Sequence, residues 1–215
     1  MINLSKTSKM PCKSWSLPAI TTCPGAHIKK GLVKACQGCY ATQGFYLMPG
    51  TKRVRDENRE GWKDDNWVSD MVARIGSSKF FRWFDSGDVY HPRLAFKIQE
   101  VVTQTPETKH WMPTRSYKVK KIKVALDKMN KLCDNIVIRY SSDSVSGGYN
   151  KRLHGSTIIH EDKLDTLNSN VHVCQAYLNN GKCGDCRACW DKTIPVIAYV
   201  AHTNKMEKVI NDHSS

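Results

Sequence analysis

Four cysteines near the C-terminal end have a spacing that is typical of metal ligands. Cys174 precedes the close group Cys183-Gly-Asp-Cys186-Arg-Ala-Cys189. The Cys-x2-Cys-x2-Cys spacing is the one with which ferredoxin-type loops surround an iron–sulfur cluster, and a more distant cysteine such as Cys174 then supplies the fourth thiolate. Zinc sites more often use separate Cys-x2-Cys pairs. We therefore predict an iron–sulfur cluster at this group and keep zinc as the alternative.

A second group of cysteines lies near the N-terminal end. It consists of Cys12, Cys23 and the pair Cys36-Gln-Gly-Cys39, and it predicts a metal site, with buried free thiols as the alternative. If all four bind, the site is closed and structural. If only Cys23, Cys36 and Cys39 bind, an iron cluster keeps one corner for a small ligand. The two groups together predict one or two [4Fe–4S] clusters, while the isolated Cys133 is expected to be a core residue.

Polar and ionisable side chains follow three predicted strands. They form the groups Asp85-Ser86-Gly87-Asp88, Thr114-Arg115-Ser116 and Ser142-Asp143-Ser144. Each group alone is also typical of a helix cap. However, the carboxyl ends of parallel strands meet at one edge of a sheet, so we expect the three groups to form one site. The candidate catalytic residues are Asp85, Asp88, Arg115 and Asp143, and the candidate cofactor-binding residues are Ser86, Gly87, Thr114 and Ser142.

The chemistry of the candidate catalytic residues is set by their side chains. Asp85 and Asp88 could act as acid and base or hold a ligand amine. Arg115 suits a carboxylate or phosphate, which it can bind through two parallel hydrogen bonds. Asp143 could act as a nucleophile or a general base.

The elements that must position these residues alternate between strands and helices. Short apolar runs predict strands at residues 79–84, 109–112, 135–140, 157–159, 171–173 and 196–200. Apolar residues at helical spacing predict a helix through residues 67–75, a second from Pro92, and a third after Ser116, which is expected to cap it. Residues after His202 are expected to form a short solvated tail.

Alternating strands and helices favour an α/β fold with parallel strands. The helices become sparse after Asp143, so the length does not suit a full eightfold barrel. We predict a partial or open (β/α) TIM-like barrel with cysteine-rich metal loops at both ends of the chain. We expect a single domain, residues 1–215, divided into an N-terminal cysteine segment (1–50), a barrel core (79–173), and the C-terminal cysteine loop with the last strand (174–202).

Composition limits the class of protein. The chain has 215 residues, of which 40% are hydrophobic, and this is typical of a globular domain. No apolar stretch is long enough to cross a membrane, and the first residues lack the core of a signal peptide. We therefore expect a cytoplasmic protein whose cysteines stay reduced, with no membrane partner. The sequence does not predict the oligomeric state.

The net charge of +13 favours a polyanionic partner, and nucleic acid is the first such partner to expect, with DNA favoured. Clustered lysines are also typical of a solvated helix face. The candidate nucleic-acid residues are Lys118, Lys120, Lys121, Lys123, Arg53 and Arg55.

The cysteine motifs and the strand-end groups resemble a phage protein family, the one labelled gene product 88. The resemblance rests on Cys23-Pro-Gly-Ala, Cys36-x2-Cys39-Tyr-Ala, Asp85-Ser-Gly-Asp88, Thr114-Arg115-Ser116 and the C-terminal group ending in Cys189-Trp, and it covers nearly the whole chain. The label implies no particular activity, but a phage-encoded protein would work in the host cytoplasm.

The order of these parts is similar to that of the radical S-adenosylmethionine enzymes. Those enzymes carry a three-cysteine motif after the first strand and a short acidic or glycine motif after the second, near the methionine amine of the cofactor. The resemblance implies that Cys23, Cys36 and Cys39 hold the cluster and that Asp85 to Asp88 lie near the methionine. The C-terminal cysteines would then hold an auxiliary cluster.

Another set of motifs resembles the transglycosylases that insert guanine or 7-deazaguanines into RNA or DNA. The similar stretches are Asp85-Ser-Gly, Met112-Pro-Thr-Arg115 and the cysteine-rich region from Cys183 to His202. This resemblance implies that Asp85 is the acid/base residue, that Asp143 attacks the sugar carbon, and that the metal is structural.

We therefore expect a phage-type iron–sulfur protein, a radical-S-adenosylmethionine-like enzyme that modifies or acts on nucleic acid. One alternative is a guanine or 7-deazaguanine transglycosylase with a structural metal site. The other is a non-enzymatic module that binds nucleic acid or a host protein and is held together by iron–sulfur clusters or zinc.

Overall fold

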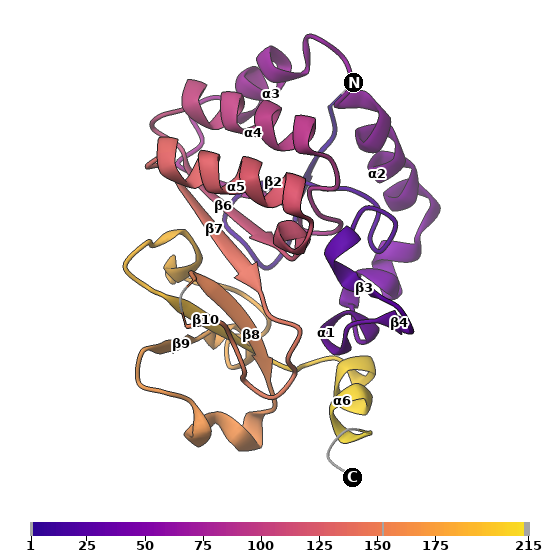
Figure 1. The fold of residues 1–215 in the computed structure, drawn as a ribbon, viewed down its shortest axis with the longest axis vertical. Coiled ribbons are helices and arrows are strands. Elements are labelled where there is room, and N and C mark those ends of the chain that lie inside the picture. Colours follow the sequence, from indigo (N-terminus) through magenta and orange to yellow (C-terminus); the bar gives the residue numbers. More distant parts are fainter. Residues whose placement is uncertain (1, 152, 213–215) are drawn as a thin grey trace.

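A computed structural model describes residues 2–151 and 153–212 (Figure 1). Strands from most of the chain form one eight-stranded sheet. The strand order is β1-β2-β5-β6-β7-β8-β10-β9. Within the described residues, β1 and β2 pair antiparallel, and the remaining pairs of this sheet are parallel. The strands are β1 (Leu4–Lys6), β2 (Lys13–Trp15), β5 (Phe80–Trp83), β6 (Lys109–Thr114), β7 (Ile136–Ser141), β8 (Gly155–Ile159), β9 (Val171–Val173) and β10 (Val196–Val200).

A separate two-stranded hairpin and the helices occupy the connections between the strands. The hairpin consists of β3 (His27–Ile28) and β4 (Gly31–Leu32). The α-helices are α1 (Lys34–Gln37), α2 (Pro49–Gly61), α3 (Trp67–Ile75), α4 (Pro92–Gln104), α5 (Lys120–Leu132) and α6 (Asn204–Asn211). None of the helices in the described part of the chain is both long and apolar enough to cross a membrane.

The predicted α/β class is confirmed. Strands β2, β5, β6, β7 and β8 lie side by side in chain order, and α4 and α5 connect successive parallel strands. Strand β10 then inserts between β8 and β9. Strands β1 and β9 are the two edge strands of this sheet, so the described residues do not form a closed barrel. The division into segments 1–50, 79–173 and 174–202 remains a prediction. Strands from all three segments belong to this one sheet.

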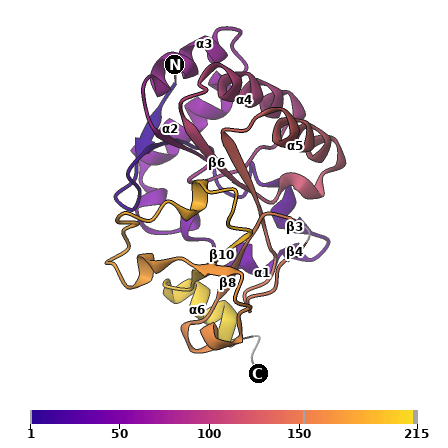
Figure 2. The same cartoon turned by 90° about the vertical axis from the view of Figure 1, so that its left-hand side faces the viewer.

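Helices α3, α4 and α5 pack side by side along one face of the sheet (Figures 1 and 2). Successive side chains of a strand point to opposite faces. In β5, Phe81 and Trp83 therefore point to the helices, where they join the main hydrophobic core. The predicted helix from Pro92 is confirmed as α4, whose first turn His91 caps by accepting a hydrogen bond from the backbone N–H of Arg93.

The opposite face of the sheet is covered by the C-terminal cysteine loop. Trp190 packs there against Phe80 and Trp111, and it donates a hydrogen bond to the backbone oxygen of Phe81 at 3.0 Å. The fully buried Arg139 of β7 holds the same loop. Its guanidinium donates four hydrogen bonds of 2.8–3.1 Å, to the backbone oxygens of Ala188, Cys189, Asp191 and Ile194.

Two predicted elements were wrong. Ser116 does not cap α5, because a 3-10 turn at Ser116–Lys118 comes first and α5 begins at Lys120. The stretch after His202 is not a solvated tail through residue 211, because it forms α6. Met206 and Ile210 lie on one face of this helix and are buried against Ala35 and Val145.

Candidate functional site

The three cysteines Cys23, Cys36 and Cys39 lie near one another in the segment that follows β2. Twelve residues separate Cys23 from Cys36, and the hairpin β3–β4 occupies half of them. The hairpin returns the chain to its starting point, where the backbone N–H of Val33 donates to the oxygen of Ala26 at 2.9 Å. Cys23 and Cys36 consequently belong to one small apolar cluster. We call Cys23, Cys36 and Cys39 the N-terminal cysteine group.

Burial governs the protonation of these thiols. It raises the pKa of Cys23, Cys36 and Cys39 above the usual value, and the negative charge of Asp88 raises the pKa of Cys23 further. A thiol of this kind is a poor nucleophile when free, because the reactive form is the thiolate. A bound metal displaces the proton, so the donor set suits metal ligation better than covalent catalysis by a free thiol.

Arg115 connects the N-terminal cysteine group to the strand ends. Its Nη1 donates to the Cys36 sulfur at 2.9 Å, its Nη2 donates to the backbone oxygen of Ser142 at 2.5 Å, and its Nε forms an ion pair with Asp143 Oδ1 at 3.1 Å. Asp143 also pairs with Lys118. The structure therefore places two predicted catalytic residues, Arg115 and Asp143, next to a predicted metal ligand.

Asp88 anchors the loop after β5 to the loop after β6. Its Oδ1 accepts hydrogen bonds from the Val89 backbone N–H and the Thr114 hydroxyl, both at 2.7 Å. Its Oδ2 accepts from the backbone N–H groups of Arg115 and Ser116, at 2.7 and 3.1 Å. Burial nevertheless raises the pKa of Asp88. With both oxygens bound twice, this carboxylate positions Arg115 and offers no free lone pair to a ligand.

Asp85 lies in a buried network with residues that follow Cys39. Its Oδ1 accepts from Arg82 at 3.1 Å and its Oδ2 from the Tyr46 hydroxyl at 2.8 Å, while Tyr40 donates to its backbone oxygen at 2.6 Å. Arg55 lies 3.7 Å from Asp85 Oδ2. Sequence reasoning missed Tyr40, Tyr46 and Arg82, because only the folded chain brings the segment after Cys39 onto the end of β5.

The predicted cofactor-binding residues hold loops in place. The Ser86 hydroxyl donates to the Leu17 backbone oxygen at 2.8 Å and accepts from Arg55. The Thr114 hydroxyl is bound to Asp88, and the Ser142 hydroxyl accepts from the backbone N–H of Ser144. Gly87 has a φ of 72°, and a β-carbon there would lie 2.6 Å from the side chain of Leu17. A left-handed residue packed this closely must be glycine.

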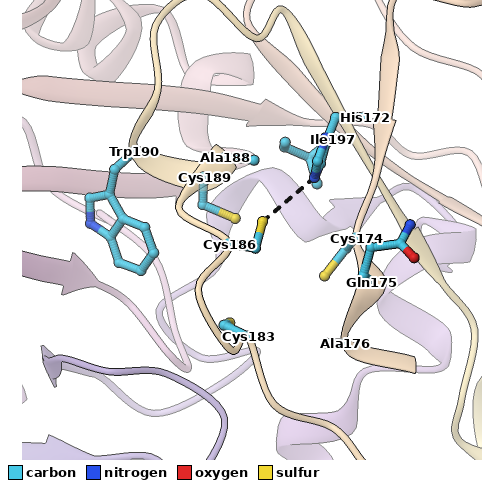
Figure 3. A pocket seen from close by; sticks show the side chains of 10 residues that line it. All are labelled: His172, Cys174, Gln175, Ala176, Cys183, Cys186, Ala188, Cys189, Trp190 and Ile197. Atoms are coloured by element: carbon cyan, nitrogen blue, oxygen red, sulfur yellow. Dashed lines mark hydrogen bonds between the residues drawn. The ribbon is translucent and has the colours of Figure 1, made fainter. Parts of the chain in front are cut away.

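The four C-terminal cysteines line one narrow cavity, to which His172 and Trp190 also contribute (Figure 3). Cys174 follows β9, while Cys183, Cys186 and Cys189 belong to the loop before β10. The Cys186 sulfur lies 3.6 Å from His172 Nε2. His172 was not predicted. His202, at the end of the region that resembles the transglycosylases, directs its Nδ1 to the backbone oxygen of Val200 and does not line the cavity.

Cys12 joins the C-terminal cysteines and not the N-terminal cysteine group. It packs with Cys183 and Cys189 in the same hydrophobic cluster, and the backbone N–H of Cys183 donates to the oxygen of Lys9 at 2.9 Å. Burial raises the pKa of Cys12 to about 11. We call Cys12, Cys174, Cys183, Cys186 and Cys189 the C-terminal cysteine group. Cys133, as predicted, is a core residue.

The donor chemistry of both groups fits an iron–sulfur cluster, which is held by cysteine thiolates. All nine cysteines are free thiols. Among the described residues, no three Cys, His, Asp or Glu side chains are arranged so that they could hold a metal ion. The cavity of the C-terminal cysteine group measures about 20 Å³.

The predicted nucleic-acid residues divide into two classes. Lys118, Lys120 and Lys121 are exposed, while Lys123 is half-buried and pairs with Asp127. Arg53 is exposed and pairs with Glu57. Arg55 does not fit this assignment, because it is buried and its guanidinium binds Ser86 and faces Asp85.

Comparison with known proteins identifies one family. The family described as gene product 88 matches residues 2–192, a range that contains both cysteine groups and the strand-end residues. No curated protein matches the chain, and neither does any solved structure. Because the match extends over most of the 215 residues, the chain belongs to the gene product 88 family.

Proposed function

We propose that this protein is an iron–sulfur enzyme of the radical S-adenosylmethionine kind that acts on nucleic acid. The observation that carries the proposal is the division of the cysteines. Of the eight outside the helical core, three lie near one another at the strand ends beside Arg115, and five lie on the sheet face opposite α3, α4 and α5. Three thiolates leave one iron of a [4Fe–4S] cluster without a protein ligand, whereas the C-terminal cysteine group has enough thiolates to close a cluster.

The N-terminal cysteine group lies beside the cationic side chain of Arg115. When bound, a cluster of this kind would supply one electron for reductive cleavage of the sulfonium C–S bond of S-adenosylmethionine. Arg115 donates to the Cys36 sulfur and would stabilise it as a thiolate. Asp88 positions Arg115 through its backbone N–H. The Asp85–Asp88 loop would face the methionine part of the ligand, as the resemblance to radical S-adenosylmethionine enzymes implies.

The proposal includes a partial (β/α) barrel. It is supported by the parallel strands β2, β5, β6, β7 and β8 in chain order and by the helices on one face. In such a barrel the carboxyl ends of the strands form the active site. The N-terminal cysteine group, Asp88, Arg115 and Asp143 all follow strands at that end.

The proposed substrate is nucleic acid, with DNA favoured, in the cytoplasm of a phage host. Support comes from the net charge of +13 and from three exposed lysines, Lys118 in the 3-10 turn before α5 and Lys120 and Lys121 at the start of α5. Lysines beside a catalytic edge bind phosphates without reading sequence. Free thiols throughout the chain also suit a reducing compartment.

Metal and sulfide analysis of anaerobically purified protein tests this proposal. We expect brown protein with about four iron and four sulfide per cluster at each of the two cysteine groups. Cys36→Ser and Cys186→Ser should each lose about half of the iron, while Cys133→Ser, a core cysteine, should lose none. Colourless protein that holds zinc would contradict the proposal. It would favour the alternative of a non-enzymatic binding module that is held together by zinc.

The transglycosylase alternative receives less support from the geometry. It requires Asp85 to transfer a proton, but Arg82 and Tyr46 already bind the two oxygens of this buried carboxylate. It also leaves the N-terminal cysteine group without a role. Incorporation of labelled guanine into DNA without a reductant, lost in Asp143→Asn, would favour it over the radical mechanism.

A further inference from the structure

A second cavity, of about 580 Å³, lies beside the N-terminal cysteine group. One wall comes from the β3–β4 hairpin and the start of α1, the second from the loop after β7, and the third from residues that follow β8. The backbone N–H of Ala35 donates to the oxygen of Asp143 at 3.2 Å and joins the first two walls. The neighbouring residue of the first wall is Cys36. The volume is in the range of small-molecule binding sites.

The charge of this cavity is positive. Asp143 is the only acidic residue among its lining residues, and both Arg115 and Lys118 pair with it. Lys34 and Lys163 also line the cavity, and neither ammonium group has an acidic partner within the described part of the chain. Such groups bind phosphate as point charges.

The remaining surface of the cavity combines apolar side chains with hydroxyl groups. Val33, Val145 and Ile210 provide the apolar part, and the last two belong to the cluster that holds α6 in place. Ser144 and Ser146 provide hydroxyl groups. A phosphate at the lysines and a flat ring on the apolar residues would use both kinds of surface.

We infer that this cavity binds a phosphorylated nucleoside, with the phosphate between Lys34 and Lys163 and the base on the apolar surface. This inference rests on the proposed function, because it names the part of the substrate that would be held next to the cluster. The same contacts would bind either a free mononucleotide or one nucleotide of a longer nucleic-acid strand. Its net positive charge makes the cavity a poorer site for the cationic sulfonium of S-adenosylmethionine.

Equilibrium binding to the full chain tests the inference. Guanosine and adenosine monophosphates should bind saturably, and the unphosphorylated nucleosides should bind at least tenfold more weakly. Lys34→Ala and Lys163→Ala should each weaken binding about tenfold, as expected for loss of a charged hydrogen bond. Lys30→Ala is the matched control, because Lys30 is an exposed lysine of the same hairpin region that does not line the cavity.

Short single-stranded oligonucleotides distinguish the two sources of the phosphate. Either tight binding of mononucleotides or tighter binding of the oligonucleotides supports the inference, provided that Lys34→Ala and Lys163→Ala weaken it. Absence of saturable binding, or equal weakening by Lys30→Ala, would overturn it. Binding is measured without reductant or S-adenosylmethionine, so its failure is distinct from a failure to find iron and sulfide.

Discussion

At the scale of single residues, the strand-end carboxylates have different environments. The three of them look alike in the sequence, because each lies in a short polar group after a strand. In the structure Asp88 accepts four hydrogen bonds, Asp85 is buried between Arg82 and Tyr46, and only Asp143 is substantially exposed. Hydrogen-bond saturation depends on distant backbone groups, and for this reason residue types and spacing do not reveal it.

Arg139 gives a prediction at this scale. Arg139→Lys should lower the free energy of unfolding by about 2 kcal/mol, because a lysine cannot reproduce the planar fork and would leave buried carbonyl groups unpaired. The variant should also lose iron from the C-terminal cysteine group and keep it at the N-terminal one. Urea unfolding and iron analysis measure both effects.

The control for Arg139→Lys is Arg74→Lys, in the last turn of α3 and outside the buried network. It should change the free energy of unfolding by less than about 0.5 kcal/mol. If the two variants have the same stability and iron content, Arg139 does not hold the cysteine loop in the way described.

At the scale of elements, the sequence predicted strands β5 to β10 and helices α3, α4 and α5, but it did not predict β1, β2 or the 13-residue helix α2. Dense apolar runs and helical spacing of apolar residues indicate which segments are buried. Strands β9 and β10 have the predicted bounds. The hairpin β3–β4 was not predicted, since two-residue strands carry almost no periodic signal. Helix α6 was missed for a similar reason. It has only two buried apolar residues, Met206 and Ile210, which is too few to form a recognisable helical pattern.

The close approach of two loops gives the prediction at this scale. A β-carbon at Gly25 would lie 2.0 Å from the backbone oxygen of Arg115. Gly25→Ala must therefore displace the turn that follows Cys23 from the end of β6, with a loss of about 1–3 kcal/mol in the free energy of unfolding. We also expect the N-terminal cysteine group to lose its iron.

Gly50→Ala is the matched control, because nothing lies within 4 Å of a β-carbon at that position in the first turn of α2. Thermal or urea unfolding should show no loss for this variant, since alanine favours a helix more than glycine does. Equal stability and equal iron content of the two variants would show that the Cys23 turn can move freely.

At the scale of the whole molecule, the two cysteine groups lie at different places on the sheet. The C-terminal cysteine group covers the face opposite α3, α4 and α5, and the N-terminal cysteine group lies at the strand ends. Sequence spacing alone placed Cys12 near Cys23, because the two are close along the chain. Strand β2 lies between them in the sequence, however, and the two ends of a strand lie at opposite ends of the sheet.

The response of the reduced protein to S-adenosylmethionine tests the central claim most directly. We predict that adding it changes the EPR spectrum of the reduced wild-type protein and of Cys186→Ser, because both retain the three-cysteine cluster with an open iron. Cys36→Ser should show no change, although its other cluster remains. A spectrum that S-adenosylmethionine does not alter in iron-loaded wild-type protein, or one that it alters equally in Cys36→Ser, would contradict the assignment of Cys23, Cys36 and Cys39 as the reactive site.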